Sequence, residues 1–428
     1  MSSNNKEFLV NSLVFIVSLA FFLLIFELAL HALVSPAKNA YGVLFGERLP
    51  PLDVVPWSRV RSTEERLARR KQWAHNLVVD DKNINFDDLG AIVREDPEIG
   101  YVPEENLASS NNWYITNSIG ARARKEFTRE VPIGKKRVLL FGDSFTAGLR
   151  LPQDETWAHF LDMKSENLEV VNFGVGGYGM GQSYLRYHQV KDRLQSRYVF
   201  LIIVPTSDLF RDINTIRSMA NKHWDSHKTN ARFILEKGKL KLIPSPYKTI
   251  DEMVSENQNG LSNKLATHLE NHESYYYPPA YQDKSTLGGS IFFKLLLLGL
   301  NDNHKNSLKR VLMKPGSEAM RINRQIFSEM SQEINSAGAK LVVIVLPRKP
   351  DIPKYNRRPG FHRQWNEMVG YFQSDEYLLW NLMDEFQSVD SEYLDKAYDN
   401  THYGPKAGRR IAEFIWKRFS GLDVPRQP

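Results

Sequence analysis

The chain has 428 residues, of which 42% are hydrophobic and 25% are charged, and its formal net charge at pH 7 is +6. The apolar content is sufficient for a large core, which excludes a disordered tail, a collagen-like repeat and a small disulfide-stapled protein. The sequence contains no cysteine. Thiolate nucleophiles, disulfides and cysteine-based metal sites are therefore excluded, while the redox compartment stays open.

An apolar run occupies the N-terminus. Residues 8–26 contain no ionisable side chain over 19 positions. A helix of that length matches the roughly 30 Å hydrocarbon core of a bilayer. After a short tail, 1–7, we expect segment 8–34 to be an uncleaved transmembrane anchor, with a signal peptide or a buried core helix as alternatives. Basic residues on the two sides of the run balance, so the charge rule leaves its orientation open.

A linker with a basic helix is expected over residues 35–93. Within it, segment 57–73 carries six basic and two acidic side chains, which account for most of the net charge. This stretch is either a solvated helix face or a surface attracted to anionic headgroups or an acidic polymer. No nucleic-acid-binding module is recognisable, so no nucleic acid partner is expected.

Residues 94–425 show the alternating pattern of an α/β domain. Apolar runs of strand length lie at 137–141, 168–173, 198–204, 340–346 and 377–382. Such continuous runs suit strands that are buried on both faces of a mainly parallel sheet. Helical patterns over 318–336 and 405–419 complete a predicted doubly wound, five-stranded fold, whose ligands should lie at the carboxyl ends of the strands.

A large insertion is expected at about 213–317, between the third and fourth strands. It begins with a predicted hairpin that turns at Lys237 and Gly238. Further on, Tyr275, Tyr276, Tyr277 and Tyr281 form a cluster beside two prolines. These tyrosines either stack on sugar rings or pack within a proline-rich loop. The apolar run 291–300 is too short to span a bilayer and is interpreted as a core or interfacial helix.

Ser144 is the first candidate for chemistry. The first strand runs directly into Gly142, Asp143 and Ser144. This position puts the serine hydroxyl at the carboxyl end of a buried strand and at the start of a helix, whose dipole favours developing negative charge. The alternative is a serine that only caps the helix.

His402 is the matching candidate base. It is preceded three residues earlier by Asp399, in the segment between the last strand and the last helix. This spacing lets a carboxylate orient the imidazole and stabilise the imidazolium that forms during catalysis. The alternative is a surface turn that caps the helix beginning near Pro405.

Two other patterns suggest different chemistry. Gly174, Gly176 and Gly179 follow the second strand with the spacing of a dinucleotide-binding loop, but no acidic residue ends a strand about 20 positions later. His223 and His227 are spaced for a metal face on a helix, without a visible further ligand. We therefore expect neither an organic cofactor nor a metal.

Together these motifs resemble the SGNH, or GDSL, hydrolase superfamily. The resemblance rests on 142–148 (GDSFTAG), 171–179 (VNFGVGGYG) and the spacing of Asp399 and His402. It implies Ser144 as nucleophile, His402 as general base and Asp399 as its orienting partner. It also implies an oxyanion hole built from the backbone N–H groups of Ser144 and Gly177.

The third motif of that family departs from the pattern. Where the family has an asparagine that donates to the oxyanion, this chain has Ser207 in the sequence Pro-Thr-Ser-Asp. Loss of such a donor typically lowers the rate by about 10²–10³-fold. The hydroxyl of Ser207 can still donate, although from a shorter side chain.

The resemblance extends to membrane-anchored bacterial members through two segments that precede the first strand, 96–101 (DPEIGY) and 117–122 (NSIGAR). It implies a serine esterase or O-acyltransferase, single-pass in the inner membrane, acting on O-acyl esters of periplasmic carbohydrate with O-acetyl as the expected group. No cofactor is implied, and partner proteins of the cell envelope stay unidentified. A catalytically impaired SGNH-fold scaffold or binding protein of an envelope assembly is the alternative.

Overall fold

A parallel five-stranded sheet organises the chain. The computed structural model describes residues 3–37, 40–54, 64–65, 92–109, 113–220, 229–257, 260–282, 287–388, 394–397 and 401–423. The strands are β6 (Lys136–Phe141), β7 (Leu168–Asn172), β8 (Tyr198–Ile203), β11 (Lys340–Val345) and β12 (Leu378–Asn381). They lie in the order β12–β11–β8–β6–β7, and every pairing is parallel. The predicted fold class is confirmed.

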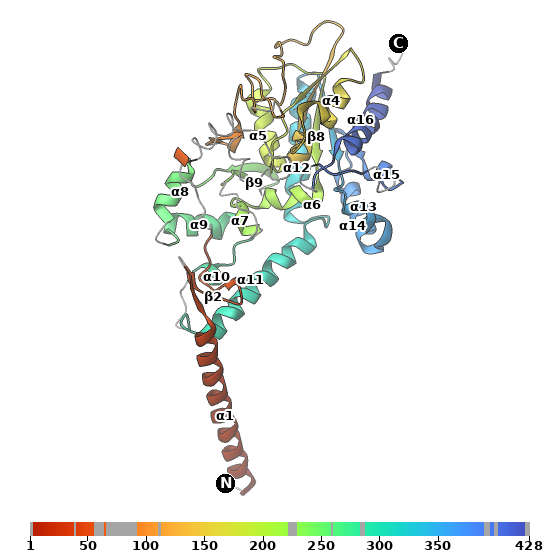
Figure 1. The fold of residues 1–428 in the computed structure, drawn as a ribbon. Helices are drawn as coiled ribbons and strands as arrows, with labels where there is room; N and C mark the ends of the chain where they lie inside the picture. The colour runs from red at the N-terminus through yellow and green to blue at the C-terminus, as the bar shows by residue number, and fades with distance from the viewer. Residues whose placement is uncertain are drawn as a thin grey trace.

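Helices cover both faces of this sheet (Figure 1). The helices that follow the strands are α3 (Ser144–Ala147), α4 (Trp157–Asp162), α5 (Met180–Val190), α6 (Pro205–Asp208), α12 (Glu318–Ser336), α13 (Asp351–Arg357), α14 (Pro359–Phe372), α15 (Met383–Phe386) and α16 (Pro405–Ser420). Phe141 contacts Tyr187 of α5, whereas Phe200 contacts Phe419 of α16. Because Phe200 is paired with Leu140, the neighbour of Phe141, the two phenylalanines point to opposite faces. The sheet is thus buried between two helical layers, as its unbroken apolar strands predict.

The segment between β8 and β11 forms its own group of elements. They are α7 (Arg217–Ala220), β9 (Arg232–Glu236), β10 (Lys239–Ile243), α8 (Ile250–Asn257), α9 (Asn263–His272), α10 (Pro278–Tyr281) and α11 (Ile291–Val311). The predicted hairpin is confirmed, because β9 and β10 pair antiparallel around Lys237 and Gly238. Tyr275, Tyr276 and Tyr281 are buried. Their role in the described structure is therefore packing, not sugar stacking on an exposed surface.

The N-terminal part begins with α1 (Ser3–Leu33), followed by β1 (Ser35–Ala37), β2 (Ala40–Leu44) and β3 (Glu47–Arg48). A second small sheet pairs β4 (Val93–Asp96) with β5 (Gly100–Pro103). Within α1, Val10–Leu33 is long and apolar enough to cross a membrane, and its side chains are almost all exposed. Apart from residues 64–65, the basic stretch 57–73 lies outside the described residues, as do His223 and His227.

Candidate active site

Ser144 lies at the carboxyl end of β6 and is the first residue of α3. The turn between them requires glycine at position 142, where φ is +154° and a Cβ would come within 2.3 Å of Thr146 Oγ1. Asp143 then caps the helix, because its carboxylate accepts the backbone N–H of Phe145 at 2.8 Å. The capping role that was the alternative for Ser144 thus belongs to Asp143, which leaves the serine hydroxyl available for another partner.

That partner is His402. Its Nε2 lies 2.8 Å from Ser144 Oγ, although the two residues are 258 positions apart in the sequence. Both side chains are buried, and the ring of Phe145 packs against the imidazole with 4.7 Å between ring centroids. The structure therefore brings together the serine and histidine that the sequence analysis singled out.

The segment that carries His402 is tied down by its backbone and by Asp395. The carbonyl of His402 accepts the N–H of Ala397 at 3.0 Å. The carboxylate of Asp395 accepts the N–H groups of Lys406 and Ala407 at 3.0 and 2.7 Å, and so caps the start of α16. Asp395 thus caps the start of α16, while Asp399 lies outside the described residues, so the capping alternative for the Asp399–His402 turn is not tested.

Gly177 lies in the loop between β7 and α5. Its φ is +81°, and a Cβ there would fall 1.9 Å from Nη1 of Arg217. Its carbonyl accepts a hydrogen bond from Arg217 Nη2, and the preceding Gly176 carbonyl accepts one from Tyr101 at 3.0 Å. Both carbonyls are thus engaged, and only glycine fits this close approach. Within the described part of the chain, the backbone N–H groups of Gly177 and Ser144 donate to no acceptor.

Ser207 lies one strand away, in α6 after the end of β8. Its hydroxyl accepts a hydrogen bond from Arg211 Nη2 at 3.0 Å, and its backbone N–H donates to the Val204 carbonyl at 2.8 Å. A guanidinium can only donate, so the hydroxyl hydrogen of Ser207 points away from Arg211. The same guanidinium lies 3.2 Å from Asp143 Oδ2, which links Ser207 to the residue that precedes Ser144.

A buried charge cluster lies beneath this group. Arg211 Nη1 also pairs with Asp208 Oδ1 at 2.7 Å, and Asp143 and Asp208 are fully buried. Burial, together with the nearby charge of Asp143, raises the pKa of Asp208 well above its usual value. Arg211, Asp143 and Asp208 thus form one buried cluster in which the guanidinium bridges the two carboxyl groups.

Arg211 was not among the site residues predicted from the sequence. A signal for it was present, because Ser207, Asp208 and Arg211 follow a strand with the i, i+3 and i, i+4 spacing that places side chains on one face of a helix. Arg122 was also missed. Its guanidinium donates to the carbonyls of Gly148 and Leu151, both at 2.6 Å, and so holds the segment that follows α3 in place.

The glycine pattern at 174–179 does not lead into a phosphate site at the start of α5. The N-terminus of α5 that would face a phosphate is already occupied by Asp212, whose carboxylate accepts the N–H groups of Met180 and Gly181 at 3.1 and 2.8 Å. A second anion there would be repelled by this carboxylate. Among the described residues, no group of three or more histidines and acidic residues is arranged to hold a metal.

A small pocket adjoins the serine and the histidine. It is lined by Ser144, Phe145, Gly148, Leu151, Trp157, His402, Tyr403 and Gly408. Trp157 closes it by donating its indole N–H to the Phe145 carbonyl at 2.8 Å. Its interior has room for a group about the size of one water molecule. A larger cavity among the described residues lies elsewhere, beside α10 and α11.

Comparisons with known proteins give low similarity. No family model and no curated protein sequence matches the chain. Among solved structures, EstA, a psychrotrophic esterase from Pseudoalteromonas sp., has 10% identity and a TM-score of 0.32, over 67% of this chain and 98% of its own. A variant of Axe2, an acetyl xylan esterase from Geobacillus stearothermophilus, has 12% identity and a TM-score of 0.33, over 68% of this chain and 97% of its own. A G-D-S-L family lipolytic protein from Veillonella parvula has 10% identity and a TM-score of 0.31, over 68% of this chain and 100% of its own.

Proposed function

We propose that the chain is a membrane-anchored serine esterase or O-acyltransferase, which acts on O-acyl esters of an extracytoplasmic carbohydrate through Ser144, His402 and Asp399. The observation that carries the proposal is the 2.8 Å distance between Ser144 Oγ and His402 Nε2. At this distance the imidazole can take the hydroxyl proton as Oγ attacks. Both groups are buried at the carboxyl edge of the sheet, where α/β folds bind their ligands.

The reaction proceeds in two steps. Ser144 Oγ attacks the ester carbonyl carbon while its proton passes to His402 Nε2. The leaving alkoxide then takes that proton, which leaves an acyl group on Ser144. Water or a sugar hydroxyl next attacks the acyl carbon, His402 accepts its proton, and the proton returns to Ser144 as the acyl–oxygen bond breaks. In this scheme Asp399 orients the imidazole.

The oxyanion of each tetrahedral intermediate would be stabilised by the N–H groups of Ser144 and Gly177 and by the hydroxyl of Ser207. This assignment is supported by the two N–H groups having no acceptor among the described residues. It is further supported by the Arg211 hydrogen bond, which turns the hydroxyl hydrogen of Ser207 away from the guanidinium. The pocket beside Ser144 has room for about a methyl group, which supports a short acyl group such as acetyl.

Retention of the N-terminal helix is supported by the way its last turns pack. Glu27 of α1 accepts backbone hydrogen bonds from Ile291 and Phe292, and Leu30 is buried in a small cluster with Ile291. Cleavage of α1 as a signal peptide would remove the acceptor of the Ile291 and Phe292 N–H groups, leave Ser290 alone to cap α11, and open that cluster. We therefore propose an anchor rather than a signal peptide, with the domain that follows outside the cytoplasm.

A fluorophosphonate probe tests the proposed nucleophile directly, because it phosphonylates a serine that is activated by its base and requires no knowledge of the ester substrate. We expect the full chain to be labelled and Ser144→Ala to lose the label completely. Ser328→Ala, which removes a serine from α12, is the matched control and should label like the natural chain. A folded chain that takes no label contradicts the enzyme and favours the scaffold alternative.

Product analysis separates hydrolysis from transfer. The chain is incubated with an acetylated glycan, with and without a glycan that carries free hydroxyls. Acetyl appearing on the second glycan indicates a transferase. Release of free acetate at the same rate whether or not the acceptor is present indicates an esterase.

A further inference from the structure

The first half of α11 carries an apolar surface that is largely exposed. Phe292, Leu296 and Leu300 are 51%, 49% and 41% exposed. Their spacing of four residues puts them on one face of the helix, one above the other. Further along the same face the side chains are polar, with Asn303 and Asn306 exposed. The face therefore changes from apolar to polar with distance from the start of the helix.

We propose that the beginning of α11 lies in the interfacial region of the membrane that α1 crosses, with Phe292, Leu296 and Leu300 facing lipid. This inference rests on the proposed anchoring of α1. It assigns a second membrane contact that is separated from the first by more than 250 residues of sequence.

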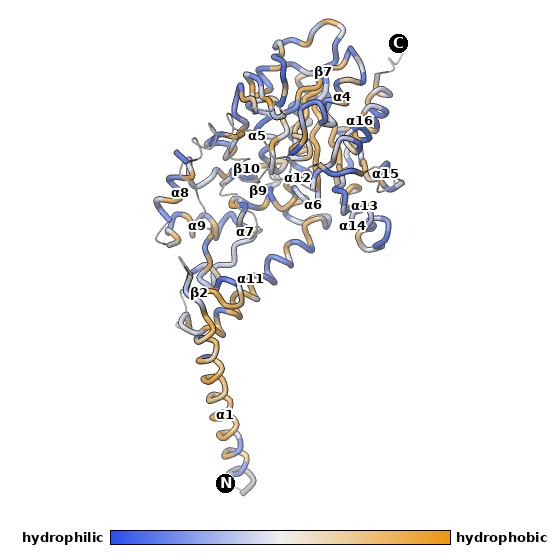
Figure 2. The backbone as a smooth tube through the Cα atoms, viewed as in Figure 1, coloured by the Kyte–Doolittle hydropathy of each residue, from blue (hydrophilic) through white to orange (hydrophobic). Residues whose placement is uncertain are grey.

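Continuity with α1 identifies the lipid bilayer as the occupant of this face. The ring of Phe26, near the end of the apolar helix, contacts the ring of Phe292 with 6.3 Å between centroids. Glu27 caps α11 by accepting the Phe292 N–H at 3.1 Å and the Ser290 hydroxyl at 3.1 Å. In Figure 1, α11 rises obliquely from the end of α1, and in Figure 2 the hydrophobic colouring of α1 continues into its first turns.

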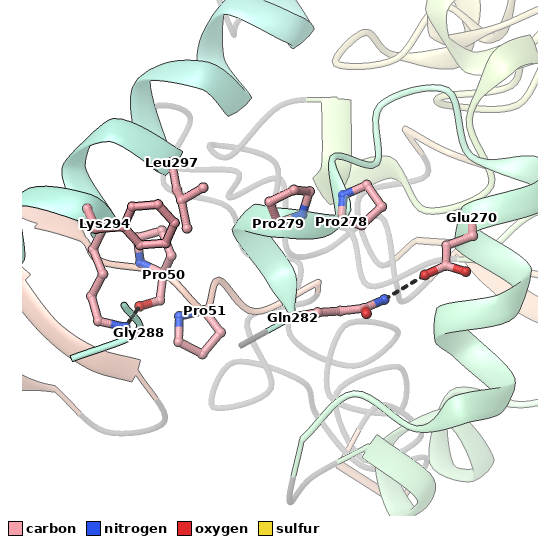
Figure 3. A pocket seen from close by; sticks show the side chains of 10 residues that line it. Pro50, Pro51, Glu270, Pro278, Pro279, Gln282, Gly288, Lys294 and Leu297 are labelled. Atoms are coloured by element: carbon pink, nitrogen blue, oxygen red, sulfur yellow. Dashed lines mark hydrogen bonds between the residues drawn. The ribbon is translucent and has the colours of Figure 1, made fainter. Parts of the chain in front are cut away.

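The opposite flank of α11 is turned toward protein. Lys294, the one charge that interrupts the apolar run 291–300, is buried and donates to the Pro50 carbonyl at 2.6 Å. Lys294 and Leu297 line an open cavity of about 310 Å³ together with Pro50 and Pro279. Figure 3 shows these side chains around the cavity. Because the lysine points to this flank, the face of α11 that contains Phe292 carries no charge. Placing that face in lipid therefore requires no charged side chain to be buried there.

The dimensions of the apolar face suit the interface. From Phe292 to Leu300 the helix advances about 12 Å along its axis. An amphipathic helix at a membrane surface buries its apolar face about 5–10 Å deep. A helix that leaves the membrane obliquely therefore places this length of apolar surface within the interface, and the asparagines beyond it in water.

Two membrane contacts determine how the domain is oriented on the bilayer. A single transmembrane helix leaves a domain free to tilt, whereas contacts through both α1 and α11 fix its orientation to the membrane. From α11 the chain continues into α12, which packs on β11 and on α5. The proposed second contact thus holds the sheet, and the candidate site at its edge, at a set height above the bilayer.

The natural absence of cysteine makes a direct test possible in the full chain. Leu296→Cys, Asn306→Cys and Val17→Cys are each labelled with an environment-sensitive fluorophore and reconstituted into phosphatidylcholine–phosphatidylglycerol vesicles. Some vesicles carry a nitroxide near the headgroup and others carry it deep in the acyl chain. We expect the label at position 296 to be blue-shifted and quenched by the shallow nitroxide, and the label at 306 to be unaffected.

The label at position 17, within α1, distinguishes a failure of the proposed α11 contact from a failure of the proposed α1 anchor. We expect it to be quenched by the deep nitroxide. If it is quenched while position 296 behaves like position 306, the interfacial placement of α11 is wrong and the anchor stands. If position 17 is not quenched, the proposed anchoring is wrong. Thermal melts monitored by circular dichroism check that each labelled chain is folded like the natural one.

Discussion

Arg211 connects several of the residues around the candidate nucleophile. Besides Ser207 and the two aspartates, it donates to the carbonyl of Tyr178 at 2.8 Å, next to Gly177 in the glycine loop. One guanidinium thereby fixes the relative positions of segments that follow three different strands. Its planar fork makes this possible, since a lysine ammonium offers a single point charge.

Ser207→Ala tests the contribution of the Ser207 hydroxyl to the proposed oxyanion hole. The family that the sequence resembles has an asparagine amide at this position. If the hydroxyl donates to the oxyanion, its loss should lower the rate of ester turnover by about 10²–10³-fold. The substitution should change thermal stability little, because Arg211 retains its bonds to Asp143, Asp208 and Tyr178. Rates are measured with a chromogenic acetate ester.

Ser207→Asn is the matched control, because it supplies an amide donor in place of the hydroxyl. It should keep at least the natural rate. An alanine variant that turns over as fast as the natural chain would exclude Ser207 from the oxyanion hole, leaving the two backbone N–H groups.

At the scale of elements, the βα turns determine where chemistry can occur. Each of β6, β7 and β8 is followed by a segment that places a backbone or side-chain group at the same edge of the sheet: Ser144, Gly177 and Ser207. The last βα connection returns His402 to that edge before α16 begins. The position of the imidazole therefore depends on how firmly the start of α16 is held.

Asp395→Ala tests this dependence. Loss of the two hydrogen bonds to Lys406 and Ala407 should lower the stability by roughly 0.5–2 kcal/mol, as for other helix caps. Because the same segment carries His402, fluorophosphonate labelling should slow at temperatures well below the melting midpoint. Stability is measured by thermal melts and labelling by its time course.

Ser317→Ala is the comparison, since Ser317 caps α12 through the N–H of Met320, far from the histidine segment in sequence. It should lower the melting temperature without slowing the label. Equal slowing in both variants would mean that labelling follows global stability and not the His402 segment.

At the scale of the whole molecule, the chain has an apolar helix at one end and the candidate site within the sheet, joined through α11 and α12 (Figure 1). The side chains of α1 that point outward are large and apolar, for example Phe15 and Phe21, which are 67% and 64% exposed. Exposure of so much apolar surface to water is unfavourable, whereas a bilayer accommodates it.

The proposed topology predicts the result of C-terminal reporter fusions to the full chain. Alkaline phosphatase, which is active only outside the cytoplasm, should be active at the C-terminus, and a cytoplasmic fluorescent protein should stay dark. The reverse pattern would place the domain in the cytoplasm and overturn the proposed extracytoplasmic substrate.

The sequence by itself determined the features that depend on neighbouring residues. The five strands, the hairpin at Lys237 and Gly238 and the helix over 318–336 follow from apolar periodicity and turn residues, which act over a few positions. Ser144 and His402 were identified from the short motifs around them. The tertiary structure decided the rest: that these two side chains meet, that Arg211 links Ser207 to Asp143, and that Asp395 caps the start of α16. It also decided that Asp212 fills the helix terminus that the glycine pattern would offer to a phosphate. These contacts join segments that are distant along the chain, and they form only when sheet order and helix packing bring the carboxyl ends of the strands to one edge.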